Sequence, residues 1–208
     1  MPQASCRTVR RKRAVESFKT ASECIGEITP NMGLFAMTRG QFSMVDAIFS
    51  CLDQAGPSEI TVWTWTVAEY EMECMDKLMR DGRVTKGTLI IDAGARGKNR
   101  GLLAMWQKTF GKDSVRYVVN HAKIATIKSE KFSLLLRGSM NLNFNPRFEQ
   151  FDITEGGEDF ELVHQIESEL PILADNCGGA EPFKASKIGN AFDIEQLDMF
   201  KGAKVWAK

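Results

Sequence analysis

The sequence predicts an α/β fold in which helices flank a mixed, largely parallel β-sheet. The first observation is that residues 40–111 alternate between helical and strand periodicity, as βαβ units do. The second is that strand-like runs follow one another between residues 115 and 138, which adds hairpins. The third is composition: 43% of the 208 residues are apolar and 26% are charged, which is typical of a globular chain.

Each element follows from its local pattern. Residues 40–56 carry apolar side chains at helical spacing and stop at Gly56-Pro57, which predicts a helix. Residues 59–67, EITVWTWTV, alternate between two sets of β-branched and aromatic residues, which predicts a strand. The same criteria predict helices over residues 68–82, 99–111 and 156–173, and strands over residues 86–92, 115–119, 121–127 and 132–138.

Cysteine and histidine usage narrows the chemistry. The five cysteines are scattered and form no CxxC pair, which is typical of reduced thiols in the cytoplasm. The sequence has no run of 18 apolar residues and no apolar segment after its basic N-terminus, so we expect neither a membrane span nor a secretory signal. It has two histidines, which excludes a histidine-rich metal centre. We therefore expect no metal and no cofactor.

The net charge of zero conceals a segmental pattern. Residues 75–148 carry fifteen basic and five acidic side chains, whereas residues 149–200 carry two basic and thirteen acidic ones. A basic block of this length predicts an anion-binding face, although neutralisation between segments explains it equally well. We divide the chain into a basic N-terminal arm (1–24), a catalytic domain (25–156), and a C-terminal helix and tail (157–208) that pack on the same domain.

Residues 120–152 hold the most reactive set of side chains. His121 and Lys123 alternate in a predicted strand and therefore share a face. The hairpin that follows returns Ser139 and Asn141 to the end of the sheet that holds His121. An ammonium, a hydroxyl and a carboxamide suit a phosphate, and an imidazole can attack phosphorus or transfer a proton. Glu149 could orient that imidazole through its second nitrogen.

This pattern resembles the phospholipase D superfamily, the HKD phosphodiesterases. The matching residues are His121-Ala122-Lys123, Gly138-Ser139-Met140-Asn141 and the downstream Glu149. The order of elements from about residue 28 to residue 155 is also similar to one phospholipase D-like half-domain of that superfamily. An HxK alone has no specificity and is matched by a half-exposed strand with an incidental histidine. HxK followed by GSxN between strands is fairly specific, and the form is that of a small, single-motif, nuclease-like member.

The resemblance implies a mechanism without metal. One motif histidine attacks phosphorus, and a second, across a twofold axis, protonates the leaving oxygen, while lysine and asparagine hold the phosphate oxygens. This chain has one HxK, and His164 lies in a predicted acidic helix without a partner lysine. The second histidine must then come from another copy of His121. The resemblance therefore predicts a twofold homodimer with the active site at its interface.

Two departures from the family pattern stand out. The motif aspartate, which is structural in the family, is replaced by Lys128. The hairpin between HxK and GSxN is about three residues longer than usual. Either the turn at residues 128–131 is extended, or the strand register differs, and a one-residue slip would turn His121 to the other face.

Further residues are weaker candidates for substrate or phosphate binding. They are Asn143 and Arg147, and, in the glycine-rich loop 94–101, Arg96, Lys98 and Arg100. Trp63 and Trp65 could stack on bases, but alternating tryptophans in a strand are more typical of a core. His164 is expected on a surface or a helix interface.

Three classes of function remain open at this point. A nuclease acting on DNA or RNA through a phosphohistidine is favoured by the single motif, the basic block and the basic arm. A non-catalytic nucleic-acid or phosphate-binding module is the alternative, because the motif aspartate is missing. A phospholipid hydrolase is disfavoured because no helix is predicted to bind a membrane surface. We expect a cytoplasmic homodimer that binds nucleic acid and no membrane.

Overall fold

The computed structural model describes residues 11–16, 20–144 and 146–170, with the backbone alone for 11–16. Its centre is an eight-stranded sheet in the order β1-β2-β8-β7-β6-β3-β4-β5. The strands are β1 (Arg11–Glu16), β2 (Met32–Thr38), β3 (Ser58–Thr64), β4 (Val84–Asp92), β5 (Val115–Val118), β6 (Ile124–Lys128), β7 (Ser133–Gly138) and β8 (Glu149–Glu155). The helices are α1 (Ala21–Ile25), α2 (Met44–Ala55), α3 (Glu69–Arg80), α4 (Arg100–Phe110) and α5 (Glu158–Glu169), with short 3₁₀ turns at Ala93–Ala95 and Lys112–Ser114.

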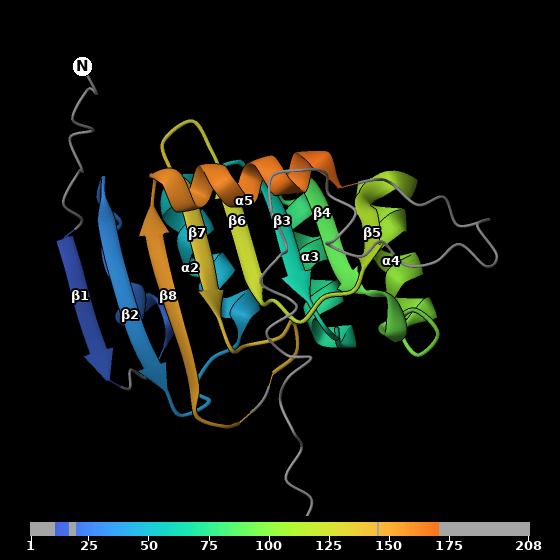
Figure 1. Cartoon of the computed structure of the whole chain (residues 1–208), viewed down its shortest axis with the longest axis horizontal. Coiled ribbons are helices and arrows are strands. Elements are labelled where there is room, and N and C mark those ends of the chain that lie inside the picture. The colour runs from blue at the N-terminus through green and yellow to red at the C-terminus, as the bar shows by residue number, and fades with distance from the viewer. Residues whose placement is uncertain (1–10, 17–19, 145, 171–208) are drawn as a thin grey trace, which may run out of the picture.

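Helices cover both faces of the sheet. In Figure 1, α5 crosses one face, and α2, α3 and α4 lie behind the strands on the other. Most of the core lies on the face covered by α2, α3 and α4, which we call the helical face. Strand β3 shows the alternation: Ile60, Val62 and Thr64 are buried, and the residues between them are half-buried or exposed. The α5 helix is attached by the buried ring of Phe160 and by the buried carboxylate of Glu167.

The predicted α/β fold with a mixed sheet is confirmed, and the pairing shows how it is mixed. Strand pairs β1–β2, β3–β4 and β4–β5 are parallel. The central pairs β2–β8, β7–β8, β6–β7 and β3–β6 are antiparallel. Four of the seven strand pairs are antiparallel, so the sheet is mixed but not largely parallel as predicted. The reason is that β8 was not predicted and inserts between β2 and β7.

The N-terminal region differs from the predicted basic arm. Residues 11–16 form β1, which pairs in parallel with β2 at the edge of the sheet. Helix α1 follows and begins at a capping box, in which the Thr20 hydroxyl accepts from the Glu23 backbone N–H and the Glu23 carboxylate accepts from Thr20. Residues 11–16 and 20–25 therefore belong to the folded domain. Residues 1–10 of the arm and 171–208 of the tail lie outside the described residues.

The hairpin of β6 and β7 has the extended turn. Lys128 pairs with Ser133, and Ile124 pairs with Arg137, so the connection spans residues 129–132 without a slip of register. Of the two alternatives that the long hairpin left open, the extended turn is the one observed. The start of β6 and the end of β7 therefore lie at the same sheet edge, where Lys123 O accepts from Gly138 N at 3.0 Å.

This sheet edge collects the chain segments that carry the candidate site. Strands β3, β4, β5 and β7 end there, at the lower edge of the sheet in Figure 1, and β6 and β8 begin there. In open α/β sheets, ligands bind at the carboxyl ends of the parallel strands. The segments after Thr64, Asp92, Val118 and Gly138 and before Glu149 are therefore the ones that build a site.

Candidate phosphate site

His121 and Lys123 lie together at this edge, immediately before β6 starts at Ile124. His121 is exposed, whereas Lys123 is buried and only 9% exposed. Lys123 Nζ donates to the His121 carbonyl at 2.8 Å and lies 3.2 Å from both ring nitrogens. The predicted pairing of the two side chains is thus observed, although the strand begins three residues later than expected.

The backbone beneath His121 is held by Asn120 and Asp92. Asp92 Oδ2 accepts from Asn120 N at 2.9 Å, and Asn120 Oδ1 accepts from Ala122 N at 2.8 Å. Asn120 Nδ2 also donates to Thr64 O at 3.1 Å. Asn120 therefore fixes the turn that presents His121, a role with no sequence signal because it acts through backbone atoms.

Ser139 and Glu149 form a second pair. Ser139 Oγ donates to Glu149 Oε2, and the same hydroxyl accepts from Gln150 N at 3.1 Å. The Ser139 N–H donates to Gln150 O at 2.9 Å. Glu149 was expected to orient His121; instead, its hydrogen-bond partner among the described residues is Ser139. The reason is geometric, because β7 and β8 are adjacent strands and bring these two side chains side by side.

Asn141 is tied to the segment that follows β3. Its Oδ1 accepts from Trp65 N at 3.3 Å, and Leu142 N donates to Thr64 Oγ1 at 3.0 Å. Within the described chain no hydrogen bond uses the Asn141 Nδ2 group, so this group remains available to donate to a phosphate oxygen. The Trp65 indole, in turn, lies beside the His121 ring, with centroids 6.0 Å apart.

Electrostatics link the two pairs. Burial lowers the pKa of Lys123 from its ordinary value of 10.5, while the negative charge of Glu149 acts in the opposite direction. Lys123 therefore lies in a setting that favours loss of its proton unless an anion binds. A phosphate at this edge would meet one buried ammonium, one amide donor and one imidazole.

This setting predicts a pH dependence of anion binding. Lys123 has a depressed pKa, so the free protein loses this charge at a pH below 10.5, and affinity for a phosphodiester falls with rising pH in that range. Lys123→Arg keeps its charge throughout, so its affinity stays flat over the same range. Titrating oligonucleotide binding against pH, with His121→Ala added to both proteins, measures both affinities. Identical profiles for the two proteins would contradict this role of Lys123.

Asn143 and Arg147 lie in the connection between β7 and β8. Asn143 is half-buried, and its Oδ1 accepts no hydrogen bond from a described residue. Arg147 is exposed, and its backbone passes so close to Gly40 that a Cβ there would lie 2.7 Å from Arg147 N. The buried carboxylate of Glu71, on α3, accepts the Phe144 N–H, and burial raises its pKa. Glu71 of α3 therefore holds the connection between β7 and β8 in place.

Arg96, Lys98 and Arg100 lie further along the same edge, after β4. The Arg96 guanidinium lies over the Tyr117 ring of β5, 4.9 Å from its centroid. Lys98 is exposed, and Arg100 is the exposed first residue of α4. The loop is thus displaced from His121 toward β5, because β3 and β4 separate it from β6 in the strand order.

Lys128 and His164 lie at the opposite end of β6. Lys128 Nζ is 3.4 Å from His164 Nε2, and His164 stacks on Phe160 within α5. His164 Nδ1 is also 3.6 Å from Glu167. The position that carries aspartate in the resembled family therefore faces α5 and not the phosphate site. His164 lies at a helix interface, as expected, near the end of β6 that is remote from His121.

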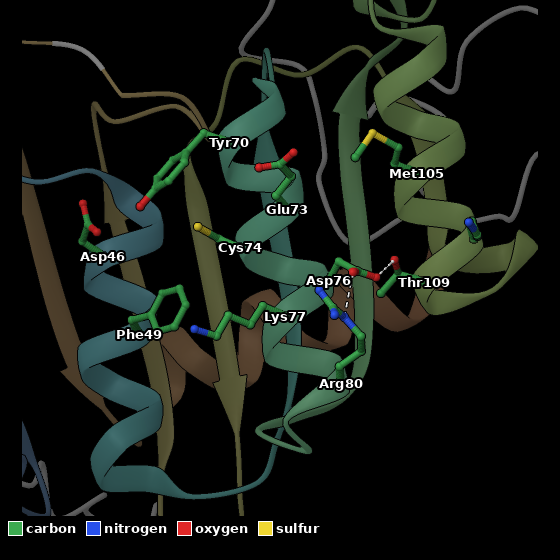
Figure 2. Close-up of a pocket in the computed structure, with 11 residues that line it drawn as sticks. Asp46, Phe49, Tyr70, Glu73, Cys74, Asp76, Lys77, Arg80, Met105 and Thr109 are labelled. Carbon is green, nitrogen blue, oxygen red and sulfur yellow. Dashed lines mark hydrogen bonds and ion pairs between the residues drawn. The ribbon is translucent and has the colours of Figure 1, made fainter.

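A separate groove of about 810 Å³ lies on the helical face, lined by α2, α3 and α4. Figure 2 shows the charged side chains that line it, and dashed lines join Asp76 to two of its neighbours. Asp76 accepts from Thr109 at 2.7 Å and forms an ion pair with Arg80 at 2.9 Å. None of the predicted site residues lines this groove.

Two further features are absent from the described residues. No group of three or more histidine, cysteine, aspartate or glutamate side chains is placed to hold a metal ion among them. Within the same residues, no helix is long and apolar enough to span a membrane.

Comparisons with known proteins show the fold. No protein-family model and no curated protein matches the sequence. The structure is similar to polyphosphate kinase from Porphyromonas gingivalis, with a TM-score of 0.51 and 15% identity, over 66% of this chain and 26% of the kinase. A second similar structure is TrmBL2, an archaeal chromatin protein, with a TM-score of 0.45 and 12% identity, over 70% of this chain and 53% of that one.

The similarity to the kinase defines a class of fold. That kinase is a phospholipase D-like structural neighbour, so this chain has a phospholipase D-like fold, as the sequence predicted. The chain spans about a quarter of the length of the kinase. At 15% identity, the likeness concerns the fold and not the activity.

Proposed function

We propose that this protein is a metal-independent phosphodiesterase, and specifically a nuclease that works through a phosphohistidine at an active site shared by two copies of the chain. The observation that carries the proposal is the cluster at one sheet edge. There Lys123 Nζ is 3.2 Å from the His121 ring, and the Asn141 carboxamide accepts the N–H of Trp65, whose indole lies beside that ring. This is the set of groups that attack on phosphorus requires.

The proposed reaction has two steps. A ring nitrogen of His121 attacks phosphorus, a P–N bond forms, and the P–O bond to the leaving group breaks. The partner subunit's His121 donates a proton to that leaving oxygen. Water then attacks the phosphohistidine, the P–N bond breaks, and the same partner imidazole takes the proton from that water. Both histidines are then back in their starting states.

The other residues have supporting roles in this proposal. Lys123 and Asn141 hold the non-bridging oxygens and stabilise the charge that grows on them in the transition state. Ser139 positions Glu149, and Glu149 keeps Lys123 charged through its own negative charge. A second chain is required because His164 lies at the other end of β6, where it contacts α5.

Nucleic acid is the proposed substrate class because cations gather along the same edge. They come from three connections: Arg39 follows β2, Arg147 precedes β8, and Arg96, Lys98 and Arg100 follow β4. A polyanion that runs along this edge passes several of them, so affinity is expected to fall steeply with salt. A cytoplasmic location stays a prediction from the sequence.

A binding module without turnover is the second candidate. One observation favours it: Glu149 bonds to Ser139 and not to the His121 imidazole, so within the described chain no carboxylate orients that ring. An imidazole without such a partner is a weaker nucleophile. In that case the same residues would bind a phosphodiester but not cleave it.

One experiment separates these candidates. Plasmid and single-stranded DNA are incubated with the protein in EDTA, and the mass in solution is measured on the same samples. The proposed function predicts cleavage without metal by a dimeric particle. Binding without cleavage supports the binding module, and neither binding nor cleavage by a clean, folded sample contradicts both candidates.

A further inference from the structure

An exposed indole lies next to the proposed nucleophile. Trp65 directly follows β3 and is 49% exposed, and its ring centroid is 6.0 Å from that of His121, with the planes inclined at 55°. Trp63, two residues earlier, is half-buried and donates its indole N–H to Glu167 at 2.8 Å. The expectation that both tryptophans belong to the core is therefore wrong for Trp65.

Hydrogen bonds hold the backbone on both sides of Trp65. Its N–H donates to Asn141 Oδ1, and Thr64 Oγ1 donates to Thr66 O at 2.7 Å. On the other side, Ala68 N donates to Leu142 O at 3.2 Å. The indole therefore extends from the same backbone segment that holds Asn141, which places it near a phosphate bound by the Asn141 amide.

Other exposed apolar side chains lie on the loops of the same edge. Val119 is 59% exposed in the connection between β5 and β6, and Phe144 and Phe148 are 52% and 70% exposed between β7 and β8. The Arg39 guanidinium lies 5.7 Å from the centre of the Phe148 ring. Aromatic rings interspersed with cations are the features that bind single-stranded nucleic acid.

We propose that Trp65 is a stacking platform for the base next to the scissile phosphate, so that the substrate is single-stranded or unpaired nucleic acid. This inference rests on the proposed function and names its substrate class. In a duplex both faces of each base are occupied by neighbouring base pairs, so the indole finds no free face. An unpaired base on the nucleotide whose phosphate is bound at His121 is close enough to stack on the indole.

The test compares three labelled oligonucleotides of one sequence: single-stranded, duplex, and single-stranded with abasic sites. Wild type is expected to prefer the first. Trp65→Ala is expected to weaken its binding and cleavage by roughly 5- to 150-fold, the value of one base–aromatic stack, and to leave the abasic and duplex substrates unaffected. Trp65→Phe retains most of the preference. Phe35→Ala, which removes a ring of 46% exposure from the middle of β2, is the matched control and is expected to have no effect.

The outcomes separate this inference from the proposed function. Equal cleavage of single strand and duplex by wild type overturns the stacking platform, and so does an equal loss on all three substrates in Trp65→Ala. Conversion of the dimer to a monomer by Trp65→Ala also overturns it, because the indole would then be a contact between subunits. If no substrate is cleaved but Trp65→Ala weakens single-strand binding alone, the platform stands and the nuclease activity fails.

Discussion

His121→Ala is expected to reduce DNA cleavage on the order of 10⁴- to 10⁶-fold, the loss typical of removing a catalytic nucleophile. The size follows from the double use of this residue in the proposed mechanism, in which one copy attacks phosphorus and the other protonates the leaving oxygen. The side chain is exposed, so its removal leaves the core intact. Cleavage rates in EDTA, measured under single-turnover conditions, provide the value.

The second histidine provides the matched control. His164→Ala removes an imidazole that lies on α5, where it stacks on Phe160 and contacts Lys128. This variant is expected to cleave at the wild-type rate once its folding has been verified by thermal unfolding. Cleavage that survives in His121→Ala, from a preparation free of other nucleases, would exclude His121 as the nucleophile.

Gly138→Ala has the largest expected effect on folding. A Cβ at this position would lie 2.3 Å from Gln150 O and 2.9 Å from the Phe151 Cα, and both are backbone atoms of β8. Strands β7 and β8 must then separate, which also breaks the hydrogen bond from Ser139 N to Gln150 O. Overpacking and one lost hydrogen bond together amount to about 2–4 kcal/mol in the free energy of unfolding.

Chemical denaturation measures this loss, and a second glycine is its control. Gly101, in the first turn of α4, has nothing within 4 Å of an added Cβ. Gly101→Ala should therefore be neutral or slightly stabilising, because alanine is the better helix former. Unchanged stability of Gly138→Ala would show that β8 does not approach β7 as closely as described. The glycine of the GSxN pattern thus has a structural reason: the strand that carries Glu149 must come close to it.

Much of the fold was predictable because the elements involved carry strong local patterns. The helix of residues 44–55 and the strand of residues 58–64 have apolar side chains at the spacing of their element, and both were located within a few residues. Strands β1, β2 and β8 were not predicted. In β2 the exposed positions are Phe35 and Met37, so both faces are apolar and no alternation marks the strand. Its pairing with β8 joins residues more than a hundred positions apart, which no local pattern indicates.

The gathering of the candidate residues at one sheet edge was predictable from the sequence, whereas their role as a site stays a prediction. His121, Lys123, Ser139, Asn141 and Glu149 lie at one sheet edge, because the hairpin register returns Gly138 beside Lys123. Their contacts were less predictable. Glu149 bonds to Ser139, because pairing across β7 and β8 places it there, and the exposure of Trp65 depends on where β3 ends. Both features come from long-range geometry, which residue spacing along the chain does not contain.

The proposed sharing of one active site by two chains can be tested by mixing subunits. Wild type and His121→Ala are unfolded and refolded together at several ratios, and the dimer is verified by its mass. A site that needs both histidines predicts activity that falls as the square of the wild-type fraction, to about a quarter at an equal mixture. Activity that falls in proportion to the wild-type fraction, to about half at an equal mixture, would show that each chain works alone.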